Sequence, residues 1–150
     1  MRTLFLIFII CLSGQMTLAQ VKDPVKWVYT AKKINPTTYE VQFTAEIEED
    51  WHIYSQTTPD GGPVPTSISF SKNPLVKPSG GVKEVGKMEQ HFEELFGVVV
   101  KQYSDKVSFV QIFNVKPGLK TAILASVEYM ACNDHECMPP KKQSFSIQLK

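Results

Sequence analysis

Two cysteines near the C-terminal end of the chain are the residues best suited to carry chemistry. Cys132 and Cys137 enclose the four residues Asn-Asp-His-Glu and are followed at once by Met138-Pro139-Pro140. Four intervening residues suit a β-hairpin loop, in which directly opposed residues lie about 4.5–5.5 Å apart at Cα. A disulfide tolerates Cα separations of about 4.4–6.8 Å. The spacing therefore predicts a bond at an exposed loop that is easily made and broken.

The residues beside the pair predict a thiol of ordinary reactivity. Asp134 and Glu136 disfavour a thiolate, whereas His135 favours one only when it is protonated. Pro139 and Pro140 restrict the backbone after the second cysteine and remove two amide donors, which keeps that end of the loop stiff. Such a pair is better suited to being attacked by a partner thiolate, or to receiving electrons within a docked complex, than to attacking indiscriminately.

The strand that leads to the first cysteine predicts where its thiol lies. Apolar residues occupy every second position from Ile123 to Ala131, so strict alternation puts Cys132 on the opposite face of the strand. We therefore expect Cys132 at an accessible strand end rather than deep in the core, as thiol exchange requires. Of the two cysteines, we expect Cys137 to be the one that resolves a mixed disulfide.

The N-terminal residues have the composition of a secretory signal peptide. Arg2 provides a positive charge, residues 4–12 are apolar, and Thr17-Leu18-Ala19 offers a small-residue cleavage site. Nine apolar residues are far fewer than the roughly 20 that span a bilayer. We predict a signal peptide over residues 1–19 and an exported mature domain over residues 20–150, without stable membrane insertion.

Length, charge and cysteine count narrow the possible classes of protein. Removing residues 1–19 from the 150-residue chain leaves 131 residues, enough for one domain with a hydrophobic core. The net charge is +1 and no basic cluster exceeds two adjacent lysines, which argues against nucleic acid as a partner. Cys11 would leave with the signal peptide, and the two remaining cysteines are too few for a disulfide framework.

Period-two alternation dominates the mature sequence and predicts an all-β fold. From Tyr39 to Ile47, for example, apolar residues alternate with polar ones as in a half-buried strand. Eight or nine strands at roughly ten-residue spacing are typical of an antiparallel β-sandwich. The expected strands span residues 25–33, 39–47, 51–55, 66–70, 82–85, 98–103, 107–115, 120–131 and 144–149.

Two segments within this pattern carry more specific predictions. Residues 98–103 and 107–115 flank a three-residue polar stretch, which predicts that they pair as a hairpin. Residues 87–96 instead place apolar side chains at helical spacing and are followed by Gly97, which predicts a short helical or irregular segment. The apolar residues of this segment are Met88, Phe92, Leu95 and Phe96.

Three stretches of the chain resemble the N-terminal periplasmic domain of the thiol:disulfide interchange protein DsbD. They are residues 127–140, which hold both cysteines and both prolines, residues 51–55 (Trp-His-Ile-Tyr-Ser) and residues 93–97 (Glu-Glu-Leu-Phe-Gly). The resemblance covers essentially the whole mature chain and implies an immunoglobulin-like antiparallel β-sandwich. It implies a periplasmic thiol–disulfide oxidoreductase of the protein-disulfide reductase type. Such a protein relays electrons through a reversible Cys132–Cys137 disulfide and needs no cofactor.

The same resemblance implies partners for the two cysteines. A thioredoxin-like redox protein, supplied with electrons by a membrane transporter, would reduce them, and they would in turn reduce disulfide-bonded proteins of the periplasm. Because this sequence stops after the domain, we expect the thioredoxin-like protein and the transporter on separate chains.

The resemblance also assigns residues around the cysteines. Residues 94–97 correspond to a cap loop, in which Leu95 and Phe96 shield the cysteines until a partner docks. The loop between the cysteines has four residues, one fewer than in the best-known members. The other residues expected around the site are His52, Tyr54, His135, Pro139 and Pro140.

Two other functions remain open from the residues alone. The cysteine pair could staple a non-enzymatic sandwich that binds a protein through its loops, although so short a loop gains little stability from closure. Alternatively, the thiolate, thioether and imidazole groups clustered here suit Cu(I) or Zn. Hairpin alternation would splay these groups to different sides, so we predict no bound metal. The groups belong to Met130, Cys132, His135, Cys137 and Met138.

Overall fold

The computed structural model describes residues 23–94, 96–118 and 120–149, and over these residues it consists of antiparallel strands joined by turns and loops. None of the described residues is helical, which confirms the predicted all-β class. The strands are β1 (Val25–Asn35), β2 (Thr38–Ile47), β3 (His52–Tyr54), β4 (Ser67–Phe70), β5 (Val76–Gly86), β6 (Glu89–Glu93), β7 (Val98–Ser104), β8 (Lys106–Val115), β9 (Thr121–Tyr129), β10 (Ala131–Cys132) and β11 (Lys141–Leu149).

The strands form three sheets, two of which enclose the main core. Their orders are β1-β2-β8-β5, β10-β3-β7-β6 and β11-β9-β4. Aromatic pairs join the first sheet to the third across the core, as expected for side chains that interdigitate between the inner faces of a sandwich. These pairs are Trp27–Tyr129 at 5.3 Å between ring centroids, Phe43–Phe145 at 5.4 Å and Phe70–Phe113 at 4.9 Å. The immunoglobulin-like sandwich predicted from the sequence is confirmed.

β2 shows how the alternating sequence produces this packing. Because successive side chains of a strand point to opposite faces, Val41, Phe43 and Ala45 all turn to the same side, where each is fully buried. β2 pairs with β1 on one edge and with β8 on the other, so its backbone is also satisfied on both sides. The pattern in this strand therefore predicts both its structure and its buried face.

The predicted hairpin between residues 98–103 and 107–115 is wrong. β7 pairs with β3 and β6, whereas β8 pairs with β2 and β5 in a different sheet. Asp105, between the two strands, has a left-handed φ of 59°, and its carbonyl accepts a hydrogen bond from the amide of Ile47 at 2.8 Å. A short polar link between two alternating runs suits a hairpin and a change of sheet equally well, so the sequence pattern could not separate them.

Residues 87–96, predicted to be a short helical or irregular segment, contain no described helix and are largely a strand. Residues 89–93 form strand β6, which pairs with β7 at the edge of its sheet. The amides of Phe96 and Gly97 donate hydrogen bonds to the Glu93 carbonyl at 3.2 and 2.8 Å and close a turn. Met88 and Phe92 are 39% and 60% exposed, so their helical spacing did not reflect a buried helix face.

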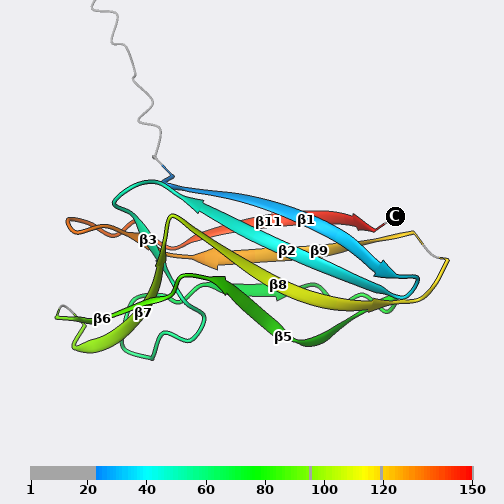
Figure 1. Ribbon diagram of the computed structural model, residues 1–150, viewed down its shortest axis with the longest axis horizontal. Helices are drawn as coiled ribbons and strands as arrows, with labels where there is room; N and C mark the ends of the chain where they lie inside the picture. The colour runs from blue at the N-terminus through cyan, green and yellow to red at the C-terminus, as the bar shows by residue number, and fades with distance from the viewer. Residues whose placement is uncertain (1–22, 95, 119, 150) are drawn as a thin grey trace, which may run out of the picture.

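The second sheet lies at one end of the molecule. Figure 1 shows β3, β6 and β7 gathered at this end, with the loop that follows β10, drawn in orange, extending from the same end. β10 continues the chain from β9 after one residue and pairs with β3, so it links the sandwich to this sheet. The two cysteines are thereby held at the end of the fold, outside the main core.

Candidate functional site

The expected disulfide joins Cys132 to Cys137 at this end of the fold. Cys132 is the last residue of β10, and the two cysteines form an isolated antiparallel bridge. Their Cα atoms are 4.0 Å apart, somewhat closer than the hairpin geometry predicted. The sequence spacing thus located the bond and the loop that it closes.

The side chain of Asn133 shapes the loop between the cysteines. Its Oδ1 accepts hydrogen bonds from the amides of His135 and Glu136 at 2.9 and 2.8 Å. Its own amide donates to the Glu136 carbonyl at 2.9 Å, and beyond the disulfide the amide of Met138 donates to the Ala131 carbonyl at 2.8 Å. Sequence reasoning missed this role, although an asparagine that follows a strand and precedes a turn is typical of this motif.

The two cysteine residues differ sharply in exposure. Cys137 is exposed, whereas Cys132 keeps only 2% of its accessible surface. Cys132 packs with Tyr54 and Val100 in a small apolar cluster separate from the main core, and Met130 packs against it. The predicted accessible position of Cys132 is therefore wrong. Alternation correctly predicted that its side chain points away from the main core, but Tyr54 and Val100 on the neighbouring strands of the second sheet pack with it there.

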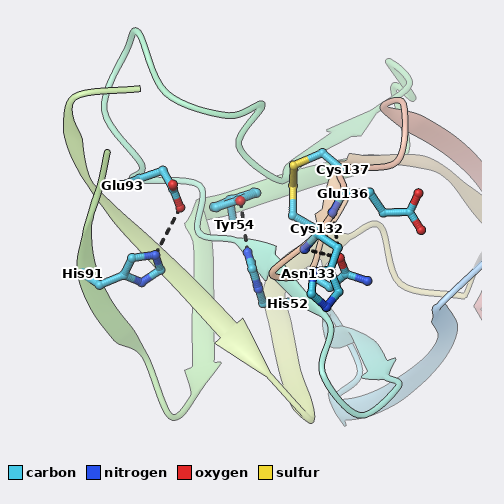
Figure 2. Close-up of a disulfide and its surroundings, with 9 residues drawn as sticks. His52, Tyr54, His91, Glu93, Cys132, Asn133, Glu136 and Cys137 are labelled. Carbon is cyan, nitrogen blue, oxygen red and sulfur yellow. Dashed lines mark hydrogen bonds and ion pairs between the residues drawn. A yellow bond between two sulfur atoms is a disulfide. The ribbon is translucent and has the colours of Figure 1, made fainter. Parts of the chain in front are cut away.

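Strand register explains which side chains gather beside Cys132. Cys132 lies opposite His52 in the β10–β3 pair, and Tyr54 lies opposite Gln102 in the β3–β7 pair. His91, on β6, lies opposite Val100 of β7. Directly opposed residues project from the same face of a sheet. One face of the second sheet therefore carries side chains from the disulfide to His91. Figure 2 shows His52 and Tyr54 between the disulfide and His91.

A cavity of about 680 Å³ opens over this face. This cavity is lined by most of the residues that were expected around the site. It is also lined by Glu93, Gln102 and Asn133, which sequence reasoning did not single out. Pro139 and Pro140 are exposed and lie outside the lining, and Leu95 lies outside the described residues. The lining residues are His52, Tyr54, His91, Glu93, Phe96, Gln102, Met130, Cys132, Asn133, Asp134, His135, Glu136 and Cys137.

His52 and Tyr54 form a polar pair on the floor of the cavity. The Nε2 of His52 lies 3.0 Å from the Oη of Tyr54, and the two rings meet edge to face at 5.2 Å. Burial raises the pKa of Tyr54 to about 12, and the Glu93 carboxylate adds to the shift. Tyr54 therefore stays a neutral hydrogen-bonding group at any physiological pH.

The pKa of His52 is lowered below its ordinary value of 6.5. Burial is the main cause, because it disfavours the charged imidazolium, and the electrostatic effect of the nearby His91 acts in the same direction. The carboxylates of Glu93, Asp134 and Glu89 oppose these two effects. The net result favours a neutral imidazole beside the disulfide at neutral pH.

His91 and Glu93 form a second polar pair across the cavity from the cysteines. The Nε2 of His91 lies 3.3 Å from a carboxylate oxygen of Glu93. Figure 2 shows this pair on the far side of His52 and Tyr54 from the disulfide. Both side chains lie on β6 two residues apart, so they project from the same face of the strand.

The described residues contain neither a cluster suited to a metal ion nor a helix suited to a membrane. Among the described residues, no group of three or more His, Cys, Asp or Glu side chains is arranged to hold a metal ion. Within the same part of the chain, no helix is long and apolar enough to cross a bilayer.

Comparison with solved structures places the fold near two bacterial domains. The N-terminal periplasmic domain of ScsB from Proteus mirabilis is similar at a TM-score of 0.58 and 15% identity, with 85% of this chain and 47% of that chain covered. The DsbD N-terminal domain from Neisseria meningitidis in its reduced form is similar at a TM-score of 0.51 and 18% identity, with 79% and 81% covered. The chain thus spans about half the length of the ScsB chain.

Sequence comparison identifies the family. No curated protein matches the chain. A family model described as "Thiol:disulfide interchange protein DsbD, N-terminal" matches residues 20–149. Together with the Cys132–Cys137 disulfide, this match supports thiol–disulfide interchange as the general chemistry of the site. The chain belongs to the family of DsbD N-terminal domains.

Proposed function

We propose that this protein is an extracytoplasmic thiol–disulfide oxidoreductase that passes electrons to partner proteins through Cys132 and Cys137. The observation that carries the proposal is the placement of the disulfide. It joins an exposed cysteine residue to a buried one at the rim of a cavity of about 680 Å³, outside the main core. A bond in this position can be opened by a partner thiolate without dismantling the sandwich.

Access decides which sulfur meets the partner. A partner thiolate can reach the exposed Cys137, so Cys137 forms the mixed disulfide and Cys132 is the leaving group. In the reverse direction Cys132 attacks the mixed disulfide and releases the partner. This order reverses the sequence-based expectation that Cys137 resolves the mixed disulfide, because that expectation took no account of the burial of Cys132.

The partners we propose are thioredoxin-like redox proteins, which a membrane transporter supplies with electrons. Membership of the DsbD N-terminal family supports this assignment. We also propose that residues 1–19 are a signal peptide that directs the domain, residues 20–150, to the periplasm. The reduced protein would then serve disulfide-bonded proteins in that compartment.

The turn after β6 supplies a cap for the cysteines. Phe96 lines the same cavity as both cysteines and is half-buried there, which supports a shielding role for its ring. We assign Leu95 to the same cap on the family resemblance of residues 93–97. His52, Tyr54 and His135 complete the surroundings of the disulfide.

Trapping of a mixed disulfide tests the proposed function. A thioredoxin-like domain with a single active-site cysteine, activated as an aryl disulfide, is mixed with the reduced wild-type protein, with Cys132→Ser and with Cys137→Ser. We expect the Cys132→Ser variant to accumulate the mixed disulfide through Cys137, the Cys137→Ser variant to react far more slowly, and the wild type to release the partner as its own disulfide forms. Failure of all three proteins to capture the domain would contradict a role in thiol exchange.

A further inference from the structure

His52 lies beside the buried Cys132, and thiol exchange between the cysteines and a partner gives it no role of its own. It lies directly opposite Cys132 in the β10–β3 pair, a position in which Cβ atoms are about 4.5–5.5 Å apart and side chains share a face. Both residues line the same cavity. Figure 2 shows the imidazole between the disulfide and the His91–Glu93 pair. The ring is thus within a side chain's reach of the sulfur that must gain or lose a proton.

The surroundings of Cys132 create a need for a proton acceptor. Cys132 keeps only 2% of its accessible surface, and this burial disfavours a thiolate because the anion loses its hydration. The loop adds the carboxylates of Asp134 and Glu136, and none of the described residues that line the cavity is a lysine or an arginine. A free Cys132 thiolate would therefore have no lysine or arginine among the described residues of the cavity to stabilise it, yet only the thiolate attacks a disulfide.

His52 has the protonation state and the hydrogen-bond geometry for this task. If its Nε2–H donates to the Oη of Tyr54, at 3.0 Å, the lone pair of the ring is on Nδ1 and is available to accept a proton. Burial favours the neutral ring, which is the form that can act as a base.

The ionisable groups around His52 come from three elements and the loop. β3 contributes Tyr54, β10 contributes Cys132, and the apposed residues of β7 are the uncharged Gln102 and Ser104. The remaining ionisable groups facing the ring are Glu89, His91 and Glu93 on β6 and Asp134, His135 and Glu136 in the loop.

We propose that His52 accepts the proton of the Cys132 thiol as Cys132 resolves the mixed disulfide. In the reverse reaction, when the Cys132–Cys137 disulfide is reduced, His52 donates a proton to Cys132. In the resolving step the Cys132 proton moves to His52 while the sulfur attacks the sulfur of Cys137. The bond between Cys137 and the partner breaks, and the partner leaves as a thiolate with the electron pair. Cys132 and Cys137 end oxidised, the partner ends reduced, and His52 then loses the proton to water. This inference rests on the proposed function.

A chromogenic aryl disulfide separates the two chemical steps in one kinetic trace. When the reduced mature protein reacts with the reagent, attack by Cys137 releases one coloured thiolate, and attack by Cys132 on the resulting mixed disulfide releases a second. The variant His52→Gln keeps a group that can hydrogen-bond to Tyr54 but cannot carry a proton. We expect it to slow the second phase by about 10²-fold at neutral pH and to leave the first phase within about twofold.

The pH dependence distinguishes proton transfer from a merely structural role. In the wild type, the rate of the second phase should rise as the pH passes the lowered pKa of His52 and then level off. In His52→Gln, this pH-dependent rise in the rate should be absent. His91→Gln removes the electrostatic effect by which His91 lowers the His52 pKa, so it should move the midpoint to higher pH while preserving the plateau rate.

Each outcome of this experiment decides between the two proposals. An equally fast second phase in His52→Gln, with the same pH profile as the wild type, would overturn the role of His52 and leave the proposed function intact. Loss of the first phase in the wild type would overturn the proposed function itself. Circular dichroism of each variant, together with an unaltered first phase, shows that the substituted proteins are folded.

Discussion

Cys132 and Cys137 share one disulfide, yet Cys137 is exposed and Cys132 keeps only 2% of its accessible surface. The difference arises because Cys132 packs with Tyr54 and Val100 within the second sheet, whereas Cys137 follows the loop shaped by Asn133. The two thiols of the reduced protein should therefore react at very different rates.

Alkylation of single-cysteine variants measures this difference directly. In Cys132→Ser only Cys137 remains, and we expect it to react with iodoacetamide at least about tenfold faster than Cys132 does in Cys137→Ser, because access governs the reaction. In concentrated urea the two variants should react at similar rates, since both thiols are then exposed. Equal rates in the folded proteins would contradict the assignment of Cys137 as the first sulfur attacked.

The cap is tested by a pair of phenylalanines on the β6–β7 hairpin. Phe96 lines the cavity with the cysteines, whereas Phe92 is 60% exposed and does not line it. We expect Phe96→Ala to speed alkylation of the reduced protein several-fold, because removal of the ring opens access to the thiols. Phe92→Ala provides the matched control and should leave the rate unchanged. If both variants behave like the wild type, Phe96 does not shield the site.

Glu84 should stabilise the end of the fold that carries the site. Its carboxylate, on β5, accepts hydrogen bonds from the Ser55 hydroxyl, the Gln56 amide and the Tyr103 hydroxyl, each at 2.7 Å. Because these bonds tie the loop after β3 to the first sheet, Glu84→Ala should lower the free energy of unfolding by about 2 kcal/mol.

Urea denaturation of the oxidised protein measures this loss. Glu46→Ala is the control, because Glu46 pairs with Lys26 only at the surface, at 3.4 Å, with the lysine side chain 75% exposed. Its removal should change stability by less than about 0.5 kcal/mol. A Glu84→Ala protein no less stable than Glu46→Ala would show that this hydrogen-bond network adds little.

Stability should depend on pH through His52. Its folded pKa lies below the unfolded value of 6.5, so between these two values the unfolded chain binds more protons than the folded one. The free energy of unfolding should therefore rise with pH across this window, with the penalty greatest below the folded pKa and absent above 6.5.

Unfolding midpoints in urea at about pH 5 and about pH 7.5 test this linkage. The oxidised wild type should gain stability between the two conditions, and His52→Gln should gain less. A variant with the same pH dependence as the wild type would assign the effect to other groups.

Most of the sandwich could be predicted because its core strands each have one buried face. In β2, alternation marks Val41, Phe43 and Ala45 as buried, and the structure buries all three. The disulfide between Cys132 and Cys137 could also be predicted, because residue spacing alone limits how far apart the two cysteines can lie.

The second sheet was harder to predict because its strands are short and its edge is exposed. β3 has three residues and β6 has five, and Phe92 of β6 faces solvent, so the pattern of apolar residues did not reveal a face. The burial of Cys132 depends on this sheet. It results from contacts with Tyr54 and Val100, which are distant in sequence, and local alternation says nothing about them.

The sequence named some of the residues that line the cavity, but not those that depend on strand register. Position in the loop identified His135, and the family resemblance identified His52, Tyr54 and Phe96, all of which line the cavity. Gln102 became visible only through its register opposite Tyr54. Pro139 and Pro140 follow the disulfide in sequence and lie outside the cavity lining, so their part in the site stays a prediction.

The reduction potential of the Cys132–Cys137 pair tests the central claim most directly. The mature protein is equilibrated in dithiol redox buffers, its free thiols are trapped, and its fold is followed by circular dichroism. If the pair acts as a redox relay, we expect its potential to lie within the range of known exchange proteins, about −120 to −270 mV. We also expect the reduced protein to stay folded, because the pair lies outside the main core. A potential below about −300 mV, or unfolding on reduction, would show that the disulfide is a structural staple and contradict the account.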